Sequence, residues 1–359
     1  MQVDQDPGGP GKPVKISVVI PCHNSPIELG ECLSALARVN WRGTEYIVVD
    51  DGSDQDLAPV ISRSGLPARL MRAPVRSGSA AARNLGAGCA TGELLVFLDA
   101  DVRVHPNTLA LIEESFEEPN GPDAVIGSYD DNPSAPGFHS QFRNLLHHYV
   151  HQTSQRQACT FWTGCGAVYR SVFESHGGFD ETTSGMDDIE LGGRLALTGA
   201  RIDLRPDIQV QHLKRWTFLL WTSTDLRLRG IPWTMLLLRN GSWPNVLNLD
   251  YRSRASVALI WAALATVAAG IFVPRAGWLA LPLLAAALWL NRRLYWFFRQ
   301  RRGSAFAVGS VAAHSVHSFI CGLSFLCGAV GFAFSRPAPR LSSDDVVLGR
   351  AAVVKDLKD

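Results

Sequence analysis

Three acidic motifs carry the strongest chemical signals in this sequence. Asp50–Ser53 and Asp99–Asp101 each follow a short apolar run directly, and the third motif, at 187–190, opens a helix-like stretch. A carboxylate such as Asp51 can accept hydrogen bonds from a nucleobase or a ribose hydroxyl, and glycine permits a tight turn beside it. The same four residues are also typical of an ordinary turn, so this motif alone leaves both readings open.

Asp99 and Asp101 lie two residues apart on an expected loop. Two such carboxylates can hold one divalent cation, which bridges phosphate oxygens and neutralises their charge. A solvated loop is the alternative interpretation. The preceding run, Leu94–Leu98, is too hydrophobic to lie outside the core, and this position favours a binding site.

Further candidates are dispersed along the chain. Asp187 and Asp188 act either as helix-capping and first-turn acids or as a general base, for which Asp188 is the first choice. His212 follows a β-like segment and is either a metal ligand or a buried structural histidine. Arg83 and Asn84 either place a cation over a pyrophosphate or form a helix-surface pair.

Short apolar strands alternate with helical stretches in the first part of the chain. This alternation predicts an α/β domain with a mostly parallel sheet, and in open α/β sheets ligands bind at the carboxyl ends of the strands. The motifs above fall at those ends. The expected strands are 16–20, 46–49 and 94–98, and the expected helices are 27–38, 78–90 and 187–198.

Composition narrows the class of protein. The chain has 34 Lys and Arg against 33 Asp and Glu, a near-neutral balance that argues against a nucleic-acid partner. Its seven cysteines form no CxxC pair, which indicates a reduced, cytosolic setting rather than a disulfide framework or a zinc site. Residues 1–14 are rich in Pro and Gly and are expected to form a disordered tail without the apolar run of a signal peptide.

The second part of the chain is strongly apolar. Residues 255–291 carry one charge in 37 positions and 303–335 carry none in 33, which excludes a purely soluble protein. As a helix, 255–273 spans about 28 Å, enough to cross the hydrocarbon core. The segment 276–291 spans only with its flanks or with local thinning of the bilayer, and 305–334 is a third candidate.

Arginine placement predicts an orientation for this region. Clusters before 255 and at 292–302 both favour the cytoplasm, which makes the segment between them a hairpin turning at Pro274-Arg275 and followed by a cytoplasmic loop. The third run then carries the tail, 336–359, to the far side unless it is re-entrant, and the side of the tail stays open. Residues 213–250, rich in Trp, Leu and Arg, form either an interfacial amphipathic segment or a helix packed on the globular domain.

The motifs taken in order resemble the family 2 glycosyltransferases of GT-A fold. The resemblance covers about residues 15–212 and implies a nucleotide-sugar donor, a UDP-sugar foremost, with Mg²⁺ or Mn²⁺ as the cofactor. The residues that carry it are Val19-Ile20-Pro21-Cys22-His23-Asn24, Val49-Asp50-Asp51-Gly52-Ser53, Gly78 with Ala82-Arg83-Asn84, Phe97-Leu98-Asp99-Ala100-Asp101, Gly177-Gly178-Phe179-Asp180-Glu181 and Asp187-Asp188-Ile189-Glu190-Leu191.

The resemblance also implies a role for each matching residue. Asp101 binds the metal with Asp99 and His212 as further ligands, and Asp188, beside Asp187, is the base of an inverting displacement. The donor-binding residues it implies are Pro21 and Asn24 in the nucleotide loop, Asp51 on the base, Arg83 and Asn84 over the donor, and Asp99 on the ribose or sugar.

The sequence departs from the family pattern at three places. Cys22-His23 stands where an aromatic residue often precedes the asparagine, and Asp187 replaces the usual glutamate. His212–Trp216 resembles the QxxRW signature of membrane-bound polysaccharide synthases, with His in place of Gln. Arg215 and Trp216 are therefore candidate donor or acceptor contacts at the membrane surface.

These features predict a membrane-bound glycosyltransferase with its catalytic domain, 15–212, on the cytoplasmic side of the cell membrane. The expected acceptor is a hydroxyl or phosphate, lipid-linked or on a glycan. Residues 251–335 are expected to form two or three transmembrane helices. The alternatives are a processive synthase of the cellulose or hyaluronan type and a catalytically silent nucleotide-binding scaffold. The acids at 99, 101 and 188 argue against the scaffold, which needs no base beside a metal site.

Overall fold

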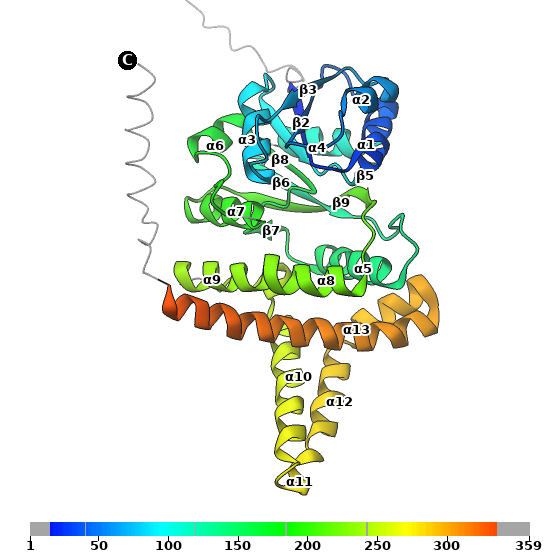
Figure 1. The fold of residues 1–359 in the computed structure, drawn as a ribbon, viewed down its shortest axis with the longest axis vertical. Coiled ribbons are helices and arrows are strands. Elements are labelled where there is room, and N and C mark those ends of the chain that lie inside the picture. Colours follow the sequence, from blue (N-terminus) through cyan, green and yellow to red (C-terminus); the bar gives the residue numbers. More distant parts are fainter. Residues whose placement is uncertain (1–14, 40, 119, 184, 242, 336–359) are drawn as a thin grey trace, which may run out of the picture.

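The structure, a computed structural model, consists of an α/β unit from which a pair of apolar helices projects (Figure 1). The tails predicted at both ends lie outside the described residues. The residues described are 15–335, except positions 40, 119, 184 and 242.

The described residues form a nine-stranded mixed sheet at the centre of the α/β unit. All the strands expected from the sequence are present with nearly the expected bounds. The strands are β1 (Ile16–Cys22), β2 (Glu45–Asp50), β3 (Ala68–Arg72), β4 (Leu94–Leu98), β5 (Val102–Val104), β6 (Ala124–Tyr129), β7 (Gln157–Ala158), β8 (Cys165–Tyr169) and β9 (Ile202–His212).

The order of the strands is β3-β2-β1-β4-β8-β6-β9-β5, with β7 paired to β9. The first four run parallel, β8 is antiparallel to both of its neighbours, and β6 and β9 are parallel to each other. The prediction of an α/β domain with a mostly parallel sheet, followed by apolar helices, is thus confirmed. Because β1, β2 and β4 end at one edge, the loops that follow them meet there.

Helices cover the sheet and form the whole second part of the structure. The helices of the α/β unit are α1 (Pro26–Val39), α2 (Ala58–Ser64), α3 (Ser79–Cys89), α4 (Thr108–Glu117), α5 (Phe138–Thr153), α6 (Arg170–Ser175) and α7 (Asp187–Leu197). The later ones are α8 (Phe218–Ser223), the π-helical turn η1 (Thr224–Gly230), α9 (Ile231–Asn240), the 3₁₀ turn η2 (Leu247–Leu249), α10 (Tyr251–Ala269), α11 (Pro274–Gly277), α12 (Ala280–Leu290) and α13 (Arg292–Phe334).

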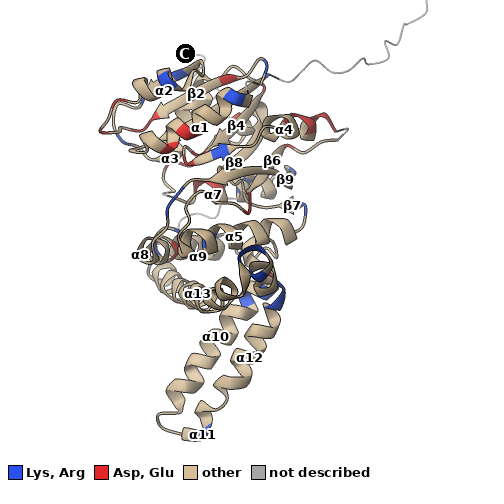
Figure 2. Cartoon of the chain, turned by 90° about the vertical axis from the view of Figure 1, so that its right-hand side faces the viewer, with Lys and Arg blue, Asp and Glu red and all other residues tan. Residues whose placement is uncertain are grey.

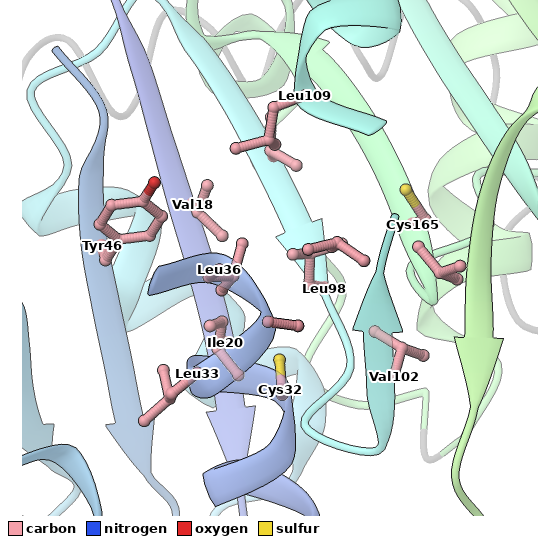
Figure 3. Close-up of a cluster of buried hydrophobic side chains, with 14 of the residues drawn as sticks. Val18, Ile20, Cys32, Leu33, Leu36, Tyr46, Leu98, Val102, Leu109 and Cys165 are labelled. Atoms are coloured by element: carbon pink, nitrogen blue, oxygen red, sulfur yellow. The ribbon is translucent and has the colours of Figure 1, made fainter. Parts of the chain in front are cut away.

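The largest buried cluster lies between α1 and the sheet (Figure 3). Cys32, Leu33 and Leu36 recur at helical spacing on one face of α1 and are fully buried. They pack over β1 and β4, whose side chains, such as Ile20 and Leu98, are buried as well. Burying each large apolar side chain contributes about 1.5–3 kcal/mol, so this cluster holds β4 and the loop after it in place.

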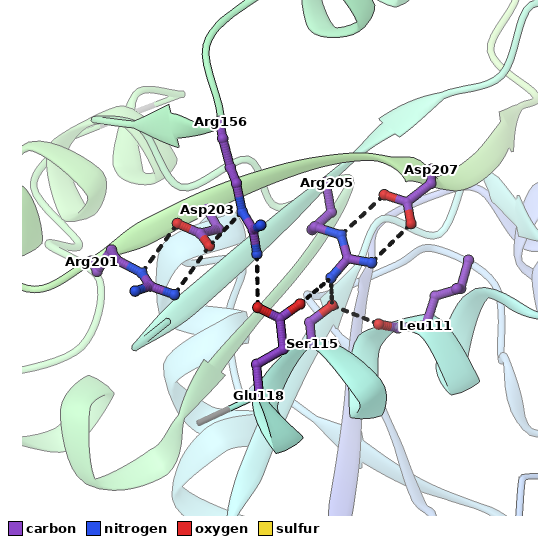
Figure 4. Close-up of polar contacts among 8 residues, drawn as sticks. All are labelled: Leu111, Ser115, Glu118, Arg156, Arg201, Asp203, Arg205 and Asp207. Atoms are coloured by element: carbon purple, nitrogen blue, oxygen red, sulfur yellow. Dashed lines mark hydrogen bonds and ion pairs between the residues drawn. The ribbon is translucent and has the colours of Figure 1, made fainter. Parts of the chain in front are cut away.

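A network of ion pairs ties the start of β9 to α4 (Figure 4). Arg156 contacts Glu118 and Asp203, each at 3.0 Å, and Arg205 donates to Ser115 Oγ at 2.8 Å. Arg205 also holds Asp207 at 2.9 Å. An exposed pair such as Arg156–Glu118 contributes at most about 1 kcal/mol, and the network chiefly fixes the path of the strand that ends at His212.

Two described helices are long and apolar enough to cross a membrane, Tyr251–Gly270 and Arg292–Phe334. Helices α10 and α12 pack on each other as a hairpin that points away from the α/β unit, with the short α11 at its tip (Figure 1). Lys and Arg gather at its base, where α13 begins, while the hairpin itself is almost free of charge (Figure 2).

Helix α13 differs from the sequence prediction at its start. Residues 292–302 are helical rather than a loop, because arginine favours helix and no glycine or proline interrupts the segment. The chain then bends at Gly303, whose φ of 84° is the left-handed conformation that glycine adopts at little cost. Beyond the bend, α13 packs along α9, η1 and α5 and runs across the base of the hairpin (Figure 1).

A third hydrophobic cluster joins the α/β unit to the later helices. It is formed by side chains of α5, of the segment after β9, of α8 and of both parts of α13. The helices that follow the α/β unit are therefore packed against it rather than tethered by a linker. Its buried members are Phe142, Leu145, Trp216, Trp221, Leu294, Phe298 and Ala313.

Candidate active site

The structure brings most of the predicted site residues to one edge of the sheet. Asp51 follows β2, Asp99 and Asp101 lie between β4 and β5, and His212 ends β9. Asp188 approaches from the first turn of α7, which is packed against β9. Groups that are more than 100 residues apart in the chain therefore share one site.

Asp51 is buried and fixes the loop that leads into α3. Its carboxylate accepts the backbone N–H of Ser77 at 2.7 Å and of Gly78 at 3.0 Å. Gly52 has a φ of 71°, and a Cβ there would lie 3.1 Å from the backbone nitrogen of Arg76. The loops after β2 and before α3 are therefore closely joined. A nucleobase would have to bind Asp51 through the carboxylate lone pairs that these two hydrogen bonds leave free.

Pro21 and Asn24 lie at the end of β1 and in the loop that follows it. Asn24 adopts a φ of 52° and exchanges two hydrogen bonds of 2.9 Å with Asp54, while its backbone N–H donates to Ser53 Oγ. Asn24 thus joins the loops after β1 and β2, the walls of the predicted nucleotide pocket. Pro21 is paired in register with Val49.

Arg83 bridges two of the acidic motifs from within α3. Its guanidinium donates to Asp187 at 2.5 Å and to Asp99 at 2.8 Å. Although burial lowers the pKa of Arg83, Asp99 and Asp187 raise it above its ordinary value. The cation is therefore permanent, and it neutralises much of the charge on these two carboxylates.

Asn84 clamps the loop that contains the Gly-Gly-Phe-Asp-Glu motif. Its side-chain amide accepts the N–H of Phe179 and donates to the carbonyl oxygen of the same residue, both at 2.9 Å. It also donates to Glu181 Oε1 at 2.9 Å. A Cβ at Gly178 would lie 2.8 Å from Asn84 Oδ1, so the glycine is required for this close approach.

Asp101 and His212 face each other across the ends of β4 and β9. Asp101 Oδ2 lies 3.9 Å from His212 Nε2. Burial and the neighbouring Asp99 raise the pKa of Asp101 to about 6. Burial, reinforced by Lys214, lowers the pKa of His212 well below its ordinary value, so the imidazole is neutral at pH 7 and can act as a metal ligand.

The acids at the start of α7 differ in their partners. Asp187 is buried and bound to Arg83, and Glu190 forms a close pair with Arg194 at 2.6 Å. Asp188 accepts only the N–H of Ile189, at 2.8 Å, among the hydrogen bonds of the described residues. Burial and Asp187 raise the pKa of Asp188 to about 6. It is thus the acid of this group whose carboxylate is free to accept a proton near neutral pH.

Arg215 and Trp216 lie on the segment between β9 and α8. Arg215 is exposed, whereas Trp216 is buried in the cluster that joins the α/β unit to the later helices. Lys214 lies 4.8 Å from the centroid of the Trp216 ring and Arg143 4.3 Å from it. The tryptophan therefore holds two cations beside the site.

The sequence alone did not reveal several residues that shape the site. Tyr129, at the end of β6, stacks on His212 with ring centroids 4.1 Å apart and an interplanar angle of 16°. Arg143 of α5 and Arg229 of η1 add cationic charge near the same edge. No local pattern marks these residues, because they reach the site only through packing of distant elements.

The predicted metal ligands form a partial site. Within the described part of the chain, no three His, Cys, Asp or Glu side chains gather closely enough to hold a metal ion. Asp101 and His212 supply an oxygen and a neutral nitrogen, while Asp99 is engaged by Arg83. One or two protein ligands completed by substrate phosphates and water are usual for Mg²⁺, so these residues fit a divalent ion that binds together with a phosphorylated donor.

Comparison with known proteins agrees with this geometry. Residues 17–177 match the model of glycosyl transferase family 2. This segment, somewhat less than half of the chain, therefore resembles a family 2 glycosyltransferase domain. It contains the predicted donor loops and the Asp99–Asp101 motif, while α7 and the end of β9 lie beyond the matched residues.

Two curated relatives match over part of their length. The pre-mycofactocin glycosyltransferase of Mycobacterium tuberculosis is 31% identical over 233 residues, which cover 60% of this chain and 46% of the relative. The glycosyltransferase GlyG of Streptococcus pneumoniae is 29% identical over 125 residues, 34% of this chain and 41% of the relative. The chain thus spans less than half the length of these relatives.

A solved structure shares the fold over nearly the whole chain. The mannosyltransferase PcManGT from Pyrobaculum calidifontis, in complex with GDP-Man and Mn²⁺, superposes with a TM-score of 0.57 at 20% identity. The match covers 90% of this chain and 88% of that chain. At this level of identity the likeness concerns the fold.

Proposed function

We propose that this protein is a membrane-bound glycosyltransferase that moves a sugar from a nucleotide-sugar donor to an acceptor hydroxyl or phosphate. The observation that carries the proposal is the carboxylate of Asp188, which forms no ion pair with the residues that the structure describes. Its two acidic neighbours are neutralised by arginines, and the Asp101–His212 pair lies at the same sheet edge. A base beside a phosphate-binding edge is the arrangement that glycosyl transfer needs.

The reaction is a single displacement with inversion. The acceptor oxygen attacks the anomeric carbon, the bond from that carbon to the diphosphate oxygen breaks, and the nucleoside diphosphate leaves with the bonding electrons. For a hydroxyl acceptor, Asp188 takes the proton. A carboxyl group with a pKa of about 6 is ionised at pH 7 and is still basic enough to assist this transfer.

Charge on the leaving diphosphate has to be neutralised as well. Asp101 and His212 would hold Mg²⁺ or Mn²⁺, which supplies charge neutralisation on the diphosphate. Arg83 keeps Asp99 and Asp187 in place, so that the repulsion between these carboxylates and the donor phosphates is reduced. Asp51 and Asn24 hold the loops that form the nucleotide pocket.

The acceptor is proposed to be lipid-linked because of the apolar hairpin formed by α10 and α12. The α10–α12 hairpin carries exposed apolar side chains such as Phe272, Leu281 and Trp289, which suit a bilayer and not water. Arginines lie at its base, as expected for a cytoplasmic surface. The bent α13 and the α8–α9 segment are proposed to lie along this surface and bring the acceptor headgroup to Asp188.

A donor screen tests the proposal. The full chain in detergent is incubated with UDP- and GDP-sugars, Mn²⁺ and a membrane lipid extract, and release of nucleoside diphosphate is measured together with transfer of radiolabelled sugar to lipid. Transfer that disappears in the Asp188→Asn variant supports the proposal. Absence of release with every donor, or release without any glycosylated product, contradicts it. Product length separates one addition from processive synthesis.

A further inference from the structure

The π-helical turn η1 lies between the candidate active site and the helices proposed to lie along the membrane surface, α8, α9 and α13. Such turns are rare and frequently occur at functional sites. The carbonyl oxygen of Leu228 lies 3.5 Å from where a Cβ of Gly185 would be, so η1 packs on the loop that leads into α7. On its other side Gly230 packs closely on Ser324 of α13.

Asp225 fixes the conformation of η1. Its carboxylate accepts Arg143 of α5 at 2.5 Å and the indole N–H of Trp221 at 2.6 Å, and His317 of α13 lies at 3.3 Å. Although burial raises the pKa of Asp225, Arg143 lowers it below the ordinary value. The carboxylate is therefore ionised, and it locks the turn to three separate elements.

Arg229 lies one helical turn beyond Asp225, and its side chain is exposed. The ion pairs of the described residues leave it without a carboxylate partner. Arg229 directly follows Leu228, so it lies where η1 packs on the loop that leads into α7, the helix that carries Asp188. An exposed guanidinium at this position, without a carboxylate partner among the ion pairs of the described residues, is available to an anionic substrate bound beside α7.

We propose that Arg229, held by the Asp225 cluster, binds a phosphate group of a substrate in the active site. This inference rests on the proposed glycosyl transfer, and it adds to that reaction a residue of η1, outside the α/β unit. A guanidinium presents paired N–H donors that match two phosphate oxygens, which suits this role better than an ammonium. The phosphate belongs either to the diphosphate of the donor or to the headgroup of the acceptor.

The exposed cations Lys214 and Arg215 extend the same surface. Neither has a carboxylate partner among the ion pairs of the described residues, and Lys214 is held over the ring of Trp216. Arg229 differs from them because its turn, η1, is held in place by the buried Arg143–Asp225 ion pair, whereas residues 214–215 are exposed. Because the backbone that carries Arg229 is already ordered, less conformational entropy is lost when this residue binds an anion.

The test compares Arg229→Gln with Arg227→Gln in the full chain. Arg227 lies on the same turn and is also exposed, so its substitution is a matched control for loss of charge. Binding of UDP and GDP with Mn²⁺ is measured by calorimetry, and the KM for lipid acceptor is measured at saturating donor. Loss of a charged hydrogen bond is expected to weaken one of these by about 10- to 100-fold.

Each outcome bears on the inference. Weaker nucleotide binding assigns Arg229 to the donor diphosphate, and a raised acceptor KM with unchanged nucleotide binding assigns it to the acceptor phosphate. Changes no larger than those of Arg227→Gln, in an active enzyme, overturn the inference while leaving the proposed function intact. An inactive wild-type chain contradicts the proposed function instead.

Asp225→Asn tests the positioning role. If Asp225 acts by holding Arg229, this variant shows the same affinity defect, and combining it with Arg229→Gln adds nothing further. An additive loss shows that Asp225 does not act through Arg229. Because Asp225→Asn alters a buried ion pair, thermal unfolding is recorded in parallel; if the variant does not fold, Trp221→Phe, which removes one hydrogen bond to Asp225, replaces it in the same comparison.

Discussion

Replacing Asp188 by asparagine removes the proposed base while keeping the shape of the side chain. The carboxylate accepts one hydrogen bond from the N–H of Ile189 at 2.8 Å, which the amide oxygen of asparagine can also accept. It forms no ion pair with a described residue. We therefore expect the Tm to change little and the donor affinity to be retained.

The turnover number, in contrast, should fall strongly. A positioned general base contributes about 10²- to 10⁴-fold, which corresponds to about 3–5 kcal/mol of transition-state stabilisation. In the wild type the base acts only when it is ionised. With a pKa of about 6, its ionised fraction falls from about nine-tenths at pH 7 to about one-tenth at pH 5, and the rate should fall with it. Saturating Mn²⁺ in this assay keeps Asp101 deprotonated.

Asp187→Asn is the matched control for this experiment. It alters the adjacent residue and removes a buried charged partner of Arg83, so it should lower the free energy of unfolding by about 3–5 kcal/mol. Single-turnover rates, nucleotide affinity and thermal unfolding are measured for both variants from pH 5 to 8. An Asp188→Asn enzyme with unchanged turnover, or with a defect confined to donor affinity, would refute the assignment of the base.

Three further predictions concern the metal, the position of α7 and the membrane. Asp101→Ala should leave the protein folded but abolish metal-dependent turnover, and near-normal turnover with intact metal dependence would contradict the assigned ligand. Gly192→Ala should destabilise the protein by about 1–3 kcal/mol in denaturant unfolding, because its Cβ would lie 2.3 Å from the backbone nitrogen of Phe161; an unchanged midpoint would show that α7 can shift freely. In a variant without native cysteines, Arg275→Cys should react with an impermeant reagent in intact cells and Gln300→Cys only after permeabilisation, and labelling of the latter in intact cells would reverse the proposed orientation.

The sequence was sufficient to predict the strands that carry the site. Leu94–Leu98 is apolar at every position because both faces of the strand are buried, and the acids that follow it lie at the sheet edge for that reason. The partners of those acids were not predictable. Arg83 and Asp187 are separated by 104 positions and meet only because α3 and α7 pack on the same sheet, so no local pattern reveals that Asp187 is bound to an arginine.

The path of α13 was also beyond the reach of sequence patterns. A long apolar segment has the same hydropathy whether its helix crosses a bilayer or lies along a surface, so hydropathy does not give its direction. The bend at Gly303 and the packing of later residues against α9 decide its direction, and both depend on contacts between distant segments. The tryptophan at 216 is a similar case, since its burial depends on helices that follow almost 80 residues later.

The hydrophobic cluster shared by the α/β unit and the later helices limits how this chain can be divided or recombined. Removal of all residues after β9 would expose Phe142 and Leu145, both fully buried, at about 1.5–3 kcal/mol each. The α/β unit is therefore not an interchangeable module that can be detached from the later helices and fused to different ones. Any exchange of anchors between homologous chains has to carry the α5 surface along with the helices that cover it.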